Sequence, residues 1–149
     1  MNLKSILYWA STAILVFCLA SGGIAELMHW EGSAAGMRLI GYPDYLMSIL
    51  GFWKELGCVA ILAPGLGRLK EWAYAGMFFE VTGAAASHWA MADYGAGAYH
   101  ILVNLFLAAM VIVSWASRPE SRIVGTLFVG QRLDRPAVGA LANLNPGRP

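Results

Sequence analysis

The stretch YLMSILGFWKELGCVAILA (residues 45–63) decides the fold, because it is long and apolar enough to cross a lipid bilayer. A membrane-spanning helix needs about 17–25 mainly apolar residues. Pro43 and Asp44 suit the first turn of such a helix, and the Pro-Gly-Leu-Gly sequence at residues 64–67 ends it. Lys54 and Glu55 lie at its centre, so a segment of membrane-spanning length carries two charges that lipid disfavours.

Three further stretches of similar length and character lie on either side, at residues 6–28, 72–92 and 98–115. A glycine-rich connection at residues 31–42 and a short turn at residues 93–97 separate them. We keep the first stretch as a helix of the mature protein, because its apolar run exceeds the roughly 7–15 residues of a signal-peptide core. The sequence therefore predicts an all-α bundle of four transmembrane helices.

The composition supports a membrane protein: 58% of the residues are hydrophobic and only 13% are charged. Soluble domains carry about 25% charged residues. The net charge of +1 gives no basic field that would indicate nucleic-acid binding. Cys18 and Cys58 lie in apolar segments without a CxxC pair, which leaves a redox or zinc motif unsupported.

Positive charge indicates the orientation of the four helices. One side of the predicted bundle receives five basic residues, namely Lys4, Arg68, Lys70, Arg118 and Arg122. The other side receives only Arg38. Basic residues concentrate on the cytoplasmic side, so both termini are expected in the cytoplasm. We expect residues 1–116 to form the membrane domain and the polar, proline-containing residues 117–149 to form a flexible cytoplasmic tail.

Polar side chains inside the predicted spans are the candidate functional residues, because ionisable groups in lipid turn towards the bundle interior and find partners. The candidates for ligand binding are Glu26, Lys54, Glu55, Glu80, Ser87, His88, His100 and Asn104. Their helical spacing predicts that three helices direct polar groups into one outward-opening cavity. Glu80, His88 and Lys54 are the catalytic candidates, and Lys54 is also expected to pair with Glu80 or Glu26.

Several kinds of chemistry fit such a cavity. A metal site is disfavoured, since the histidines lie on separate helices and form no HxxxH or HxxH pair. A quinone could accept hydrogen bonds from histidine and carboxyl groups while aromatic rings such as Trp53 cover it. Isomerisation or cyclisation of a lipophilic substrate by Glu80 and a histidine is an alternative. A non-catalytic structural or interaction subunit is another, so the residues leave open whether the protein is an enzyme.

Four segments carry a resemblance to a known family: GYPDY at residues 41–45, LGFWKELG at 50–57, PGLGRLKEWAYAG at 64–76 and GAAASH at 83–88. Together they resemble the DoxX-like family of small four-helix bacterial membrane proteins, over about residues 6–116. The resemblance implies a multi-pass protein of the bacterial inner membrane. Wider relatives include a subunit of an archaeal thiosulfate:quinone oxidoreductase, which implies a quinone-associated oxidoreductase subunit.

No covalent cofactor is expected, because the sequence contains no flavin, haem or dinucleotide motif. If the protein takes part in electron transfer, another oxidoreductase subunit or a free quinone must carry the electrons. The lipid bilayer is the first expected partner. A homodimer is a further expectation, because so small a bundle exposes much of its surface to lipid.

Overall fold

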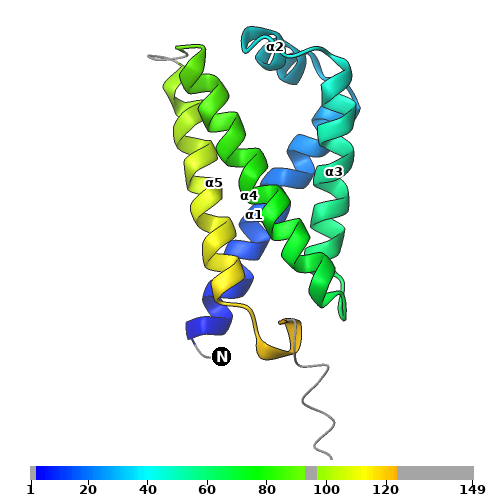
Figure 1. The fold of residues 1–149 in the computed structure, drawn as a ribbon, viewed down its shortest axis with the longest axis vertical. Helices are drawn as coiled ribbons and strands as arrows, with labels where there is room; N and C mark the ends of the chain where they lie inside the picture. Colours follow the sequence, from blue (N-terminus) through cyan, green and yellow to red (C-terminus); the bar gives the residue numbers. More distant parts are fainter. Residues whose placement is uncertain (1–2, 93–96, 124–149) are drawn as a thin grey trace, which may run out of the picture.

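The computed structural model describes residues 3–92 and 97–123, which form five α-helices and one short 3-10 turn. The helices are α1 (Leu3–Leu27), α2 (Glu31–Leu39), α3 (Tyr45–Leu62), α4 (Gly67–Ala90) and α5 (Ala98–Ala116), followed by the turn η2 (Glu120–Arg122). The four long helices pack as a bundle, in which α1 and α4 each contact both α3 and α5 (Figure 1). The prediction of an all-α fold is confirmed.

Three of the described helices, α1, α3 and α5, are long and apolar enough to cross a membrane. Only 22–28% of each apolar stretch is buried inside the bundle, so many apolar side chains remain on its outer surface, as lipid-facing residues do. The remaining long helix, α4, has 24 residues but is less apolar, because Glu80 and several small polar residues interrupt it. It also begins five residues before the predicted start at Trp72 (72 − 67 = 5).

The predicted glycine-rich connection at residues 31–42 contains a helix that the sequence analysis did not predict, because α2 occupies most of it. Its residues Ala34 and Met37 are buried and pack with Met47 of α3. Two apolar residues three positions apart share a helical face, and this face gives the segment a reason to be helical. Burial of that face outweighed the weak helix propensity of its glycines.

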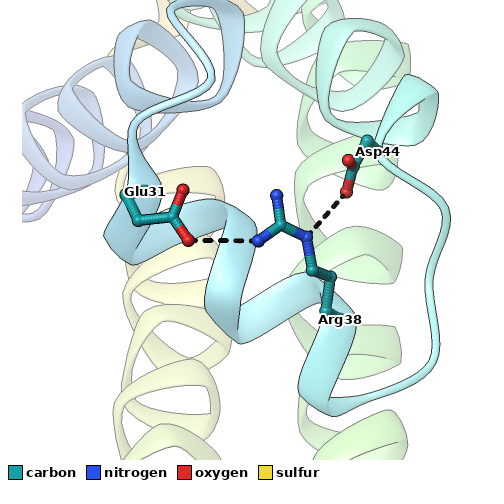
Figure 2. Close-up of polar contacts among 3 residues, drawn as sticks. All are labelled: Glu31, Arg38 and Asp44. Atoms are coloured by element: carbon teal, nitrogen blue, oxygen red, sulfur yellow. Dashed lines mark hydrogen bonds and ion pairs between the residues drawn. The ribbon is translucent and has the colours of Figure 1, made fainter.

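Charged side chains complete α2. Glu31 lies in the first turn and Arg38 in the last, the order that the helix dipole favours. Arg38 donates hydrogen bonds to Glu31 at 3.1 Å and to Asp44 at 3.3 Å, and so links both ends of α2 to the start of α3 (Figure 2). These side chains are exposed, so the links position α2 more than they stabilise it.

An apolar cluster forms the core of the bundle, and a group of buried, hydrogen-bonded hydroxyls lies beside it. Leu15 and Ile61 are fully buried at its centre. Beside them, the Ser114 hydroxyl of α5 lies 2.8 Å from the Thr12 hydroxyl of α1 and 2.8 Å from the Tyr74 hydroxyl of α4. Because each polar atom finds a partner, this group joins three helices without leaving a hydroxyl unsatisfied.

Helices α1 and α3 cross with their backbones in contact. A Cβ atom added at Gly51 would lie 2.7 Å from the carbonyl oxygen of Gly23 and 2.9 Å from the Leu27 side chain. Only glycine allows this approach. The crossing places Glu26, one turn after Gly23, opposite Lys54, one turn after Gly51.

Basic side chains close the opposite end of α3. The buried Lys70 ammonium donates hydrogen bonds to the carbonyl oxygens of Ala60, Ile61 and Ala63, which the helix end would otherwise leave unsatisfied.

Residues 117–123, the start of the predicted tail, return to this same end of the bundle. Arg122 donates hydrogen bonds to the Tyr8 hydroxyl and to the Ile61 carbonyl, both at 3.1 Å. Arg118 is buried and forms an ion pair of 2.7 Å with Glu71. The rest of the predicted tail, residues 124–149, lies outside the described residues.

Candidate functional site

An ion triad lies where α1, α3 and α4 face one another. Glu26 comes from α1, Lys54 from α3 and Glu80 from α4. The Lys54 ammonium donates a hydrogen bond to Glu26 and lies 3.0 Å from a carboxylate oxygen of Glu80. The side chains of Lys54 and Glu26 are each 13% exposed and that of Glu80 is 21% exposed, so all three are largely removed from solvent.

The triad confirms that Lys54 pairs with a buried carboxylate, and it does so with both of the residues considered. A single ammonium serves two carboxylates because three helices each contribute one charged side chain at the same level. Removing either partner of such a buried pair leaves a charge without compensation. The three residues therefore form one unit that ties three helices together.

Glu55 adds a third carboxyl group near the triad. Within residues 3–92 and 97–123, its Oε1 atom is buried without a hydrogen-bond partner. This oxygen lies 2.5 Å from the position that a Cβ atom added at Gly23 of α1 would take. One oxygen of Glu26, Oε2, is likewise buried without a partner. Buried polar atoms are normally paired. The carboxyl oxygens at this level thus exceed the donors that the described residues provide.

An apolar groove of about 510 Å³ runs along the outer surface between α3 and α4 and reaches the triad. Glu80 is the one charged residue that lines it. The other lining residues are apolar, namely Leu50, Trp53, Leu56, Gly57, Val59, Ala60, Leu66, Leu69, Trp72, Ala73, Gly76 and Met77. The groove therefore combines a long apolar surface, open on the outside of the bundle, with one charged group, as sites for lipophilic ligands do.

The sequence predicts a role for Glu80 and for the ring of Trp53, but it does not predict the groove itself. The α4 residues that line the groove lie three or four positions apart, at Leu69, Trp72, Gly76 and Glu80. This spacing places them on one helical face, which is visible in the sequence. Gly76 is the useful signal, because a residue without a side chain in the middle of an apolar face leaves space. The sequence does not show that α3 faces this space.

The remaining candidate residues lie elsewhere. His88 and His100 stack on each other, with ring centroids 4.6 Å apart. Asn104 donates a hydrogen bond to the His100 carbonyl of its own helix, and the Ser87 hydroxyl lies 2.5 Å from the Tyr42 hydroxyl.

The polar residues thus form two groups instead of meeting in one cavity. Glu80 and His88 are separated by just over two turns of α4, about 12 Å along the helix. Within residues 3–92 and 97–123, no three histidine, cysteine, aspartate or glutamate side chains come close enough to hold a metal ion.

A comparison of the chain with models of known protein families identifies the family to which it belongs. The family model described as the DoxX-like family matches residues 10–114. The chain belongs to the DoxX-like family. The match includes the four long helices almost completely, with all three members of the triad and the whole groove of this DoxX-like protein. No curated protein and no solved structure matches the chain.

Proposed function

We propose that this DoxX-like protein binds a quinone, or a similar flat lipophilic molecule, in the groove between α3 and α4. The observation that carries the proposal is that an apolar groove, open on the outside of the bundle, ends at Glu80, a member of the buried ion triad. A lipophilic ring with a long tail can enter such a groove directly from the bilayer. Its apolar part would replace lipid against the groove walls, while Glu80 would meet its polar end.

The groove residues fit a quinone in three respects. The groove volume of about 510 Å³ suits a small ligand or part of a larger one. Trp53 and Trp72 supply flat aromatic surfaces against which a ring can stack. When protonated, Glu80 supplies the O–H donor that a quinone carbonyl needs, whereas Lys54 is already engaged with Glu26 and Glu80. A bound quinone would supply redox chemistry, and the residues named here would hold and orient it.

The proposed residue roles follow from these positions. Glu80 contacts the ligand, and Lys54 and Glu26 position Glu80. His88 and His100 belong to the second polar group and do not line the groove. Because the chain carries no motif for a redox cofactor, we propose that electrons reach the quinone from another oxidoreductase subunit.

We also propose that α4 is a fourth membrane span in a bacterial inner membrane, with both termini in the cytoplasm. Its packing against α3 and α5, two apolar helices of spanning length, supports this placement. Lys70 and Arg122 bind carbonyl oxygens at the end of α3, and Arg118 pairs with Glu71 near the start of α4. Arg38 belongs to α2, which lies at the other end of the bundle (Figure 1). That asymmetry favours a cytoplasmic location for the end with three basic residues.

Filling the groove tests the proposal. Gly76 lines the groove and a Cβ added there would meet no atom within 4 Å, so Gly76→Leu should fill the space without distorting α4. Gly83→Leu is the matched control, since Gly83 lies two turns further along α4, is equally unobstructed and does not line the groove. The assay is saturable quenching of tryptophan fluorescence by decylubiquinone in lipid nanodiscs.

We expect saturable quenching in the wild type and in Gly83→Leu, and at least tenfold weaker binding in Gly76→Leu. Trp53 and Trp72 line the groove and should report the ligand directly. Equal binding by the two leucine variants would refute the groove as the site. The absence of saturable quenching in folded wild-type protein would refute quinone binding altogether.

A further inference from the structure

The charges of the triad do not balance. Glu26 and Glu80 bring two carboxyl groups to the single ammonium of Lys54, which within residues 3–92 and 97–123 is the cation that pairs with them. On α3, Glu55 adds a third carboxyl group with a buried, unpartnered oxygen, and the thiol of Cys58 lies one turn further on. If every carboxyl group were ionised, this largely buried region would carry a net negative charge.

A buried carboxylate without a cation is strongly disfavoured, and it avoids the cost by holding a proton. One proton shared by Glu26 and Glu80 would leave one carboxylate for one ammonium. Glu26 accepts a hydrogen bond from the Lys54 ammonium, which favours the ionised form of its carboxyl group. Glu80 is more exposed and is the one that lines the groove.

We propose that Glu80 is a protonated carboxylic acid in the ligand-free protein and donates a hydrogen bond to a carbonyl oxygen of the ligand in the α3–α4 groove. This inference rests on the proposed function and names the chemistry that the site recognises. The preferred ligand is a neutral lipophilic molecule with a hydrogen-bond acceptor at one end. Lys54 and Glu26 remain an ion pair whose position keeps the proton on Glu80.

The arrangement gives opposite expectations for two isosteric substitutions around the same ammonium. Glu80→Gln removes the titrating group but keeps an N–H donor at the groove, so binding should persist and should not depend on pH. Glu26→Gln leaves Lys54 with Glu80 as its only carboxylate partner in the triad, so Glu80 should give up its proton more readily. A purely structural role for the triad would make the two variants behave alike.

The first test measures the dissociation constant of decylubiquinone between pH 5 and 9 by quenching of tryptophan fluorescence. In the wild type it should be constant at low pH and then rise about tenfold per pH unit once Glu80 deprotonates, because one proton is linked to binding. Glu80→Gln should give a flat profile, and Glu26→Gln a rise that begins at lower pH. A flat wild-type profile, or a Glu80→Gln profile that follows the wild type, would overturn the inference.

The second test needs no ligand. Infrared difference spectra between low and high pH should contain the carbonyl stretching band of a protonated carboxylic acid, lost in Glu80→Gln and retained in the control Glu55→Gln. If decylubiquinone does not bind, the proposed function is refuted, but the band still shows whether Glu80 is protonated. Absence of a Glu80-dependent band at neutral pH would overturn the inference. Circular dichroism verifies that each variant is folded. If Glu80→Gln does not fold, Glu26→Gln replaces it in the test, because the Glu80 band should disappear at a lower pH in Glu26→Gln than in the wild type.

Discussion

Replacing Lys54 with methionine should expose the energetic role of the triad. The substitution keeps the length of the side chain and removes the one positive charge between Glu26 and Glu80, whose side chains are 13% and 21% exposed. If a carboxylate stays ionised, a buried charge without its partner costs about 3–5 kcal/mol. If the carboxylate instead takes up a proton, the free energy of protonation at pH 7 is set by the distance from the reference pKa of glutamate, near 4.3. That distance is about 2.7 pH units, which corresponds to about 3.7 kcal/mol.

Both routes therefore predict that Lys54→Met loses about 3–5 kcal/mol of stability at neutral pH. Protonation becomes easier as the pH falls, and at pH 5 the same calculation gives only about 1 kcal/mol. The variant should thus recover most of its stability between pH 7 and pH 5. The measurement is reversible unfolding in mixed micelles with increasing sodium dodecyl sulfate, followed by circular dichroism at both pH values.

A neutral triple variant is the control. Lys54→Met combined with Glu26→Gln and Glu80→Gln removes the charges together and should be more stable at pH 7 than Lys54→Met alone, since the buried charge is gone. The reasoning is refuted if Lys54→Met is as stable as the wild type at pH 7, or if the triple variant is no more stable than the single one.

Three further substitutions test the packing around the site. Gly51→Ala should destabilise the bundle by about 1–3 kcal/mol in the same unfolding assay, because its Cβ would lie 2.7 Å from a backbone oxygen, while Gly22→Ala, with open space, should be neutral or slightly stabilising. Ser114→Ala should cost about 1–3 kcal/mol by leaving two buried hydroxyls unpaired, more than Tyr74→Phe, and equal losses would contradict the network. Lys70→Met should cost about 2–5 kcal/mol and speed amide hydrogen exchange in the last turn of α3, and unchanged exchange there would contradict the capping role.

The sequence predicted the long helices and the partners of Lys54 for simple physical reasons. Apolar runs of spanning length have few alternatives to helix in lipid. A lysine in the middle of such a run must find a carboxylate, and Glu26 and Glu80 were the residues at a suitable depth. These arguments depend on composition and on position along one helix, both of which the sequence contains.

What the sequence could not predict depends on how helices are placed against one another. The prediction of a single polar cavity relied on which helical face each residue shares. A shared face does not show how far apart two residues lie along the helix, and His88 lies too far along α4 to contact Glu80. The groove exists because α3 and α4 leave space beside Gly76, which a sequence does not show. The helix within the glycine-rich connection at residues 31–42 depends on the burial of Ala34 and Met37, which the sequence does not show.

The glycine contact between α1 and α3 has an electrical consequence. Two positions without side chains set the spacing of the two helices, and that spacing sets the reach between Glu26 and Lys54. With an effective dielectric constant near 20, moving two unit charges from 3 Å to 4 Å apart weakens their attraction by about 1.4 kcal/mol. That is about a tenfold change in how firmly a nearby acid retains its hydrogen ion. In this protein, a change in the spacing of α1 and α3 as small as one methyl group would therefore change the proton affinity of the carboxyl groups nearby.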